Sequence, residues 1–127
     1  YTKVSDTAFT AIEHEKEYDI THIINKLKEK EHTLILYNKV TLDDNRNEIK
    51  SILGTLRINS LNENLFITIG YCEFENILME QTIAIAERTV HDTLHKIIMV
   101  WKANSIIGKI EKIEDLKNIQ WFTGKTL

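Results

Sequence analysis

The sequence lacks proline altogether and contains a single cysteine among its 127 residues. At an average usage of about 5%, a chain of this length would carry roughly six prolines. Because Cys72 is alone, no intrachain disulfide can form, which excludes a secreted protein held together by disulfides. Asn-x-Ser/Thr glycosylation sites are also absent. These absences favour a reducing compartment, and we expect a cytoplasmic protein.

Long apolar runs and glycine-rich loops are missing as well. No apolar stretch approaches the roughly 18 residues that a membrane-spanning helix needs. The four glycines are widely scattered and form no P-loop, G-x-G-x-x-G or G-x-S-x-G motif. Phosphate-cradling loops and serine triads of the familiar kinds are therefore disfavoured.

The composition is that of a folded domain. Hydrophobic residues make up 43% of the chain and charged residues 28%, close to the averages for globular proteins. No linker, repeat or low-complexity segment divides the sequence, so we expect residues 1–127 to form a single domain. The chain opens with Tyr1 and shows no signal-like segment, which favours a fragment of a longer protein.

The first half of the sequence predicts a helix between two strands. Apolar residues from Ile20 to Leu27 recur at the spacing of one face of an amphipathic helix, which we expect over residues 19–30. Residues 33–42 are rich in strand-forming side chains and predict a strand. The alternation over residues 1–12 predicts another.

The middle of the sequence begins with a turn, which the composition of residues 43–47 predicts. The apolar spacing that follows favours a short helix ending near Gly54, with the return strand of a hairpin as the alternative. Residues 65–72 are apolar on both faces and predict a central strand.

The second half predicts a long helix, which begins at Asn76, and then a hairpin. Residues 97–113 are expected to form two strands around a turn, and residues 114–122 a closing helical turn. The apolar residues that repeat every three or four positions along the long helix are Ile83, Ala86, Val90, Leu94 and Ile97.

Apart from the inserted short helix, this order of elements is that of the ferredoxin-like sandwich. In this α+β fold an antiparallel sheet has helices packed on one face. The segment Ile67-Thr68-Ile69-Gly70, followed by an alanine-containing helix, resembles part of the palm of nucleotide cyclases such as the diguanylate cyclases. The Gly-Gly-[Asp/Glu]-Glu-Phe signature that holds the metal in that family is absent, so the resemblance implies a fold and no activity.

Glu87, His91 and His95 form the candidate metal site. On the predicted long helix their spacing of four residues places the three side chains in one stripe, where they could share a zinc or other divalent ion. Asp92 follows His91, so the His-Glu-x-x-His motif is not present. A solvated polar stripe explains the pattern more simply, and we expect no cofactor.

Charge is distributed unevenly along the chain, whose net charge is -3. Up to His95 there are 10 Lys and Arg against 16 Asp and Glu, whereas from Lys96 onward 6 Lys stand against 3 acidic residues. Trp101, Trp121 and Phe122 lie in this basic part, and aromatic side chains among lysines can bind single-stranded nucleic acid. The lysines are dispersed and no arginine is present there, so a surface for self-association or for a partner fits better.

The leading hypothesis is therefore a non-enzymatic regulatory or adaptor binding module. We expect it to form a homodimer, with the hairpin over residues 97–113 pairing across a two-fold axis, and to bind a small molecule or a protein. The alternative is a small enzyme with its site around Glu87, His91, His95 and Tyr71. A weak nucleic-acid-binding module that uses the basic aromatic C-terminal region is the third hypothesis.

Overall fold

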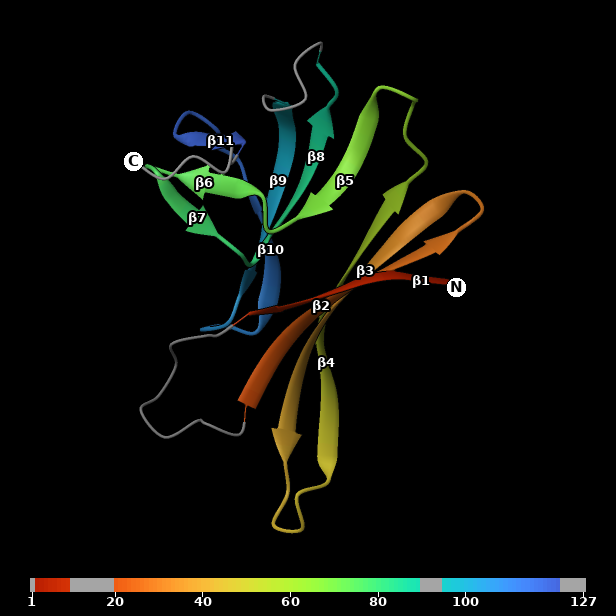
Figure 1. Ribbon diagram of the computed structural model, residues 1–127, viewed down its shortest axis with the longest axis vertical. Coiled ribbons are helices and arrows are strands. Elements are labelled where there is room, and N and C mark those ends of the chain that lie inside the picture. The colour runs from red at the N-terminus through yellow and green to blue at the C-terminus, as the bar shows by residue number, and fades with distance from the viewer. Residues whose placement is uncertain (1, 10–19, 90–94, 122–127) are drawn as a thin grey trace. The chain divides into compact units, whose positions relative to one another are not determined.

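The computed structural model describes residues 2–9, 20–89 and 95–121, and all regular structure in these ranges is β-strand (Figure 1). The strands form three antiparallel sheets. The expected α+β class and the ferredoxin-like sandwich with its packed helices are therefore wrong, because the protein is all-β. No helix able to cross a membrane is found in the described ranges. Contacts within the chain define two compact units, residues 1–60 with 103–110, and residues 61–102 with 111–127.

The first unit is built on a four-stranded meander in which each strand pairs with the next along the chain. Ile24 of the second strand lies opposite Tyr37 of the third, and both are fully buried together with Ile35. The predicted turn at residues 43–47 is confirmed, since the Asp43 carboxylate accepts backbone hydrogen bonds that close it. The strands are β1 (Thr2–Phe9), β2 (Ile20–Glu29), β3 (His32–Leu42) and β4 (Glu48–Asn59).

The helix predicted over residues 19–30 is wrong because its described part is strand β2. The strand buries Ile24 on one face and Asn25 on the other. Because both faces bury side chains, the apolar residues do not alternate with polar ones, and their spacing imitates a helix. The many β-branched residues of this segment, which restrict χ1 and favour strands, were the better signal.

The short helix predicted before Gly54 is also wrong, and the alternative of a return strand is correct. Tyr37 pairs with Gly54 but Asn38 pairs with Ile52, so Leu53 is the extra residue of a β-bulge. The bulge interrupts the two-residue period of β4 and produces an apolar spacing close to that of a helix.

The second unit contains most of a four-stranded sheet in the order β10-β9-β8-β5, together with a small sheet in the order β11-β6-β7. Its core joins the two sheets. Cys72 and Ile119 of the small sheet pack with Ala84 and Val100 of the larger one. The strands are β5 (Leu65–Ile69), β6 (Cys72–Phe74), β7 (Ile77–Met79), β8 (Thr82–Glu87), β9 (Lys96–Asn104), β10 (Lys109–Ile113) and β11 (Ile119–Trp121).

The long helix predicted from Asn76 is replaced by strands β7 and β8, while residues 90–94 lie outside the described ranges. The alanine-containing helix of the cyclase resemblance is therefore also absent from the described residues. Glu75 and Asn76 both have positive φ, 50° and 68°, and form the two-residue turn of the β6–β7 hairpin. Neither is glycine, so the usual sequence signal of such a turn is missing.

Strand β5 confirms the first part of the strand predicted over residues 65–72. The chain then turns at Gly70, whose φ of 83° favours glycine and whose backbone N–H donates to the carbonyl of Thr82 at 2.9 Å. Because of this turn Cys72 starts a strand of a different sheet.

The predicted hairpin over residues 97–113 is confirmed as strands β9 and β10. Its tip, residues 103–110, belongs to the first unit. There Ile110 lies so close over Gly54 that a Cβ atom at Gly54 would come within 3.2 Å of Ile110 Cγ1. The helical turn predicted over residues 114–122 is wrong, since Ile119–Trp121 is strand β11.

Candidate functional site

Glu87, the first residue of the predicted helical stripe, lies in a strand and not in a helix. Glu87 is the last residue of strand β8, and the preceding residue, Ala86, pairs with Phe66 of β5. Since side chains alternate along a strand, the side chains of Glu87 and Phe66 lie on different faces of the sheet. The ring of His95 contacts Phe66, so it lies on the face away from Glu87. His91 lies outside the described residues.

The described residues include no group of three His, Cys, Asp or Glu side chains that could hold a metal ion. Cys72 is buried in the core of the second unit, and this burial raises the pKa of its thiol. A higher pKa leaves less of the reactive thiolate at neutral pH, so the environment is that of a packing residue.

His95 instead belongs to a group of stacked rings, which we call the aromatic cluster: Phe66, Tyr71, His95 and Trp121. Trp121 is its centre. The ring of Tyr71 stacks on Trp121 with 5.3 Å between centroids and 9° between planes. Phe66 and His95 contact Trp121 at nearly right angles, with centroid distances of 5.7 and 4.8 Å. Phe66 and His95 also meet edge to face at 5.0 Å.

A cation completes one end of the aromatic cluster. The guanidinium of Arg88 lies 4.7 Å from the centroid of Phe66, a distance at which a cation is attracted to the face of the ring. The backbone N–H of Arg88 donates to the carbonyl of Asn64 at 2.8 Å, which fixes the start of the loop that follows β8.

The two sheets of the second unit bring the aromatic cluster together. Phe66 lies on β5 opposite Ala86, and Trp121 lies on β11 opposite Cys72. Ala86 is fully buried, and its small side chain leaves volume above the sheet that large rings can fill. Tyr71 enters from the turn that Gly70 makes between the sheets.

The aromatic cluster is open to solvent at Tyr71, which is 51% exposed although it stacks on Trp121. Stacked and edge-to-face ring pairs contribute about 0.5–1.5 kcal/mol each beyond the area that they bury. Tyr71 is therefore held against the cluster through its stacking on Trp121, which Phe66 and His95 contact in turn. The aromatic cluster thus presents the ring of Tyr71 as a flat platform at the surface.

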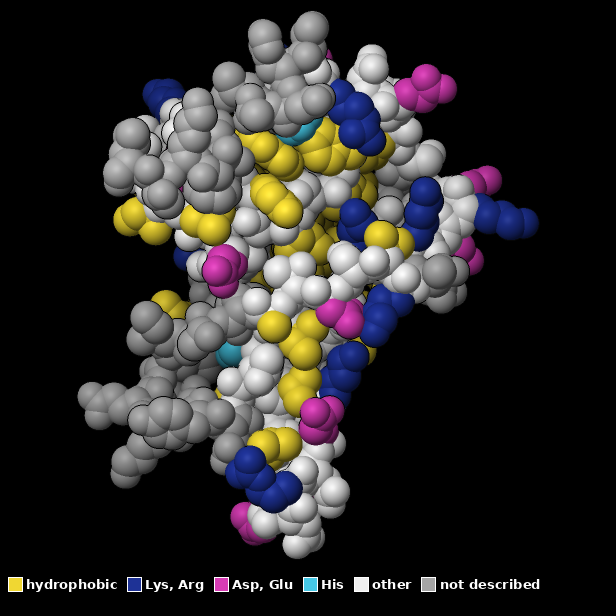
Figure 2. Space-filling model, viewed as in Figure 1, with side chains coloured by type: hydrophobic (Ala, Val, Ile, Leu, Met, Phe, Trp, Pro, Cys, Tyr) yellow, Lys and Arg dark blue, Asp and Glu magenta, His cyan; other side chains and the backbone are white. Residues whose placement is uncertain are grey.

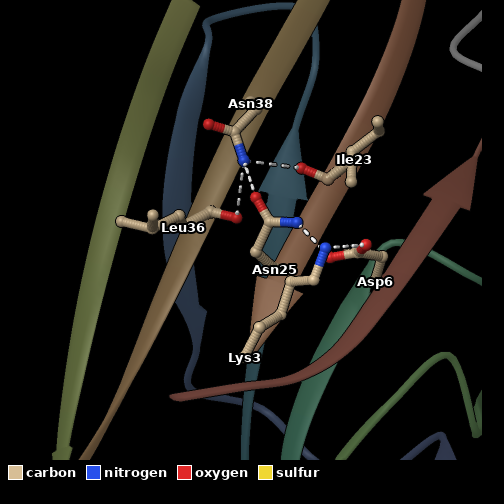
Figure 3. Close-up of polar contacts among 6 residues, drawn as sticks. All are labelled: Lys3, Asp6, Ile23, Asn25, Leu36 and Asn38. Carbon is tan, nitrogen blue, oxygen red and sulfur yellow. Dashed lines mark hydrogen bonds and ion pairs between the residues drawn. The ribbon is translucent and has the colours of Figure 1, made fainter. Parts of the chain in front are cut away.

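The first unit contains a separate polar feature, a chain of side-chain hydrogen bonds that crosses three strands (Figure 3). Lys3 of β1 forms an ion pair with Asp6 at 2.9 Å, and Asp6 accepts a hydrogen bond from Asn25 of β2. Asn25 in turn accepts a hydrogen bond from Asn38 of β3. On the opposite face of the sheet, the phenol of Tyr37 lies 2.7 Å from Nδ1 of His22.

These side chains largely satisfy one another inside the sheet, so they fix its strands rather than present groups to a ligand. Among the described residues no donor reaches the buried Asn38 Oδ1. The sequence offered a signal here, because Asn38 lies in the middle of a well-predicted strand, where asparagine is disfavoured. Phe66 and Arg88 carried no such signal, since Phe66 meets Trp121 only through the packing of two sheets and Arg88 meets Phe66 only in the folded chain.

The remaining aromatic residues of the basic C-terminal part are separate from the cluster. Trp101 pairs with Ile83 on the face of the sheet away from Val100, and Phe122 lies outside the described residues.

The chain matches no protein-family model, no curated protein and no solved structure.

Proposed function

We propose that the protein is a non-enzymatic binding module that holds a ring-shaped small molecule against Tyr71. The observation that supports this proposal is the half-exposed Tyr71 ring, which stacks parallel to Trp121, while Phe66 and His95 contact Trp121 edge to face. Because Tyr71 already stacks on Trp121, a ligand that stacks on its ring would lose little of the binding energy to rearranging the site.

The ligand that suits this platform is uncharged and has a flat, apolar ring face. Aromatic faces attract other rings through dispersion and through the charge distribution of the π system. These forces do not distinguish strongly between one base or ring substituent and another. The net charge of -3 opposes polyanions, so we place single nucleobases and sugar rings ahead of nucleic acid strands. The regulatory or adaptor role would follow from binding without chemistry.

The test uses adenosine and a cello-oligosaccharide as probes of the two ring types. Binding is followed by the fluorescence of Trp121 in a Trp101→Phe background and by the NMR resonances of the Tyr71 ring. Base stacking on an aromatic side chain contributes about 1–3 kcal/mol, so Tyr71→Ala should weaken binding by about fivefold to 150-fold. Tyr71→Phe retains the ring and should bind with nearly unchanged affinity.

Ile77→Ala is the matched control, because Ile77 is 69% exposed on the small sheet and is not part of the aromatic cluster. It should leave binding unchanged. Binding of one probe alone identifies the ring type. If neither probe perturbs Trp121 or Tyr71 at millimolar concentration, or if Tyr71→Ala binds as well as the unsubstituted protein, the proposal is wrong.

Self-association and a cytoplasmic location complete the proposal. The lone and buried Cys72 suits a reducing compartment. Exposed isoleucines favour association with another protein surface, and two of them, Ile49 and Ile52, lie on the edge strand β4 at 50% and 60% exposure.

A further inference from the structure

We propose that two copies of the chain pair through the first half of β4, antiparallel across a two-fold axis at Ile49. This inference rests on the self-association proposed above and is independent of ring binding at Tyr71. It assigns that association to a particular strand and a particular register.

The first half of β4 is an open edge. The sheet order places β4 last, so β3 is the one described strand that pairs with it (Figure 1). Residues 48–52 are exposed without exception, although they alternate between the two faces of the sheet. Figure 2 shows hydrophobic, basic and acidic side chains following one another along this part of the molecule. An edge strand that carries exposed isoleucines invites another strand to pair with it.

The backbone of this edge is oriented for pairing. Across the hairpin the N–H of Asp43 donates to the carbonyl of Asn47, which identifies these two residues as a hydrogen-bonded pair. In an antiparallel ladder such pairs alternate with pairs that are not hydrogen-bonded, so the backbone groups of Ile49 face β3. The backbone groups of Glu48 and Lys50 consequently face outward at the free edge.

One register satisfies both the backbone and the charges. With Ile49 opposite Ile49 of the second copy, Glu48 lies opposite Lys50 of that copy, and the symmetry repeats the pair. The outward backbone groups of Glu48 and Lys50 then exchange hydrogen bonds, and opposite charges lie directly across from each other, a stabilising arrangement. The two isoleucines meet on the other face.

The neighbouring registers lack this match. A two-fold axis at Lys50 would place lysine opposite lysine, which is destabilising. An axis at Ile52 would place the extra residue of the bulge, Leu53, within the paired segment, where it disrupts the ladder. Register and charge therefore point to the same axis.

Strand β10 of the confirmed hairpin, an edge of the other four-stranded sheet, has less to gain from pairing. Its first apolar residue, Ile110, is half-buried over Gly54, and its exposed positions carry charged side chains. Charged residues on an edge strand protect it from pairing. We therefore assign self-association to β4 in place of the hairpin over residues 97–113 that the sequence favoured.

Charge reversal tests the register. Glu48→Lys places lysine opposite Lys50, and Lys50→Glu places glutamate opposite Glu48, so each should convert a micromolar dimer to monomer in analytical ultracentrifugation. The double variant Glu48→Lys/Lys50→Glu restores opposite charges and should restore the dimer. Glu111→Lys makes the same change on the other edge strand and should leave the dimer intact.

Crosslinking gives an independent test. The Cα atoms of a pair that is not hydrogen-bonded are about 4.5 Å apart, within the range of a disulfide. Ile49→Cys should therefore form a disulfide-linked dimer on mild oxidation, whereas Ser51→Cys, which would face Asn47 of the second copy, should not. The native Cys72 is buried and does not compete.

A strict monomer at micromolar concentration would overturn both self-association and this inference. A dimer that survives both single reversals, with no crosslink at Ile49→Cys, would overturn the register while leaving self-association in place. Neither result would alter ring binding at Tyr71, which is measured separately with adenosine and the oligosaccharide.

Discussion

Removal of the buried phenol in the first unit is the sharpest test of what stabilises that unit. Tyr37 is fully buried, and its hydroxyl lies 2.7 Å from Nδ1 of His22, which is itself 2% exposed. The two rings also stack at 5.7 Å. Tyr37→Phe keeps the ring and its packing but deletes the hydroxyl, so it isolates the polar contact.

The magnitude follows from burial. A satisfied hydrogen bond contributes only about 0.5–1.5 kcal/mol net, because the unfolded chain bonds to water instead. Deleting one partner of a buried pair adds the cost of desolvating the other, which brings the expected loss to about 1–3 kcal/mol. For a chain of this length about 1 kcal/mol corresponds to roughly 4 °C in melting temperature, so we expect a decrease of about 4–12 °C.

The assay is thermal and urea unfolding followed by circular dichroism, with Tyr71→Phe as the matched control. This control makes the identical chemical change at a residue that is 51% exposed, where the hydroxyl is hydrated in both states, and it should change stability by less than about 0.5 kcal/mol. Equal unfolding midpoints for the two variants would refute the reasoning, because they would show that the buried hydroxyl contributes nothing.

Three further predictions concern pH, packing and metal. Hydrogen bonds from Lys3 and then Asn25 hold the pKa of Asp6 below its usual 3.8, so the carboxylate stabilises the fold above that pH. This contribution to the free energy of unfolding should be lost as the pH falls below 3.8. In urea unfolding measured from pH 5 to 3, Asp6→Asn should therefore make the free energy of unfolding less dependent on pH. Gly54→Ala should lower stability by about 1–3 kcal/mol in urea unfolding, because its Cβ would crowd Ile110, whereas Ser51→Ala at an exposed position of the same strand should change little. Zinc or a chelator should leave the melting temperature unchanged, because Glu87 and His95 lie on opposite faces of one sheet; a stabilisation that grows with zinc concentration would contradict this.

The elements that could be predicted from the sequence are those whose local signals agreed. Residues 33–42 combine β-branched and aromatic side chains, and the Asp- and Asn-rich residues 43–47 form a turn closed by the Asp43 side chain. The hairpin over residues 97–113 was also visible, because two apolar segments flank a turn at Asn104, whose side chain accepts a hydrogen bond from the N–H of Ile106. In each case one short segment contains the whole signal.

The sequence predicted helices because the buried polar residues were assigned to solvent, so the apolar spacing did not include them. In β2, His22 and Asn25 occupy buried positions that a division into polar and apolar residues assigns to solvent. Once such positions are counted as exposed, the apolar residues that remain show a period of three to four. The hydrogen-bond partners of Asn25, which are Asp6 and Asn38, come from other strands and cannot be inferred from β2 alone.

The candidate site depended even more on tertiary structure, and one sequence feature explains both the error and the site. Ile83 and Ala86 of β8 belong to the apolar repeat of three and four residues that favoured a long helix. In the sheet the alternation of isoleucine and alanine places Ile83 and Ile85 on one face and the small Ala84 and Ala86 on the other, and all four are buried. Phe66 lies opposite Ala86 on the face of the alanines and contacts Trp121, on which the exposed Tyr71 stacks. Ala86, which belongs to the apolar repeat that imitates a helix in the sequence, is therefore also the residue that lies opposite Phe66 of the aromatic cluster in the structure.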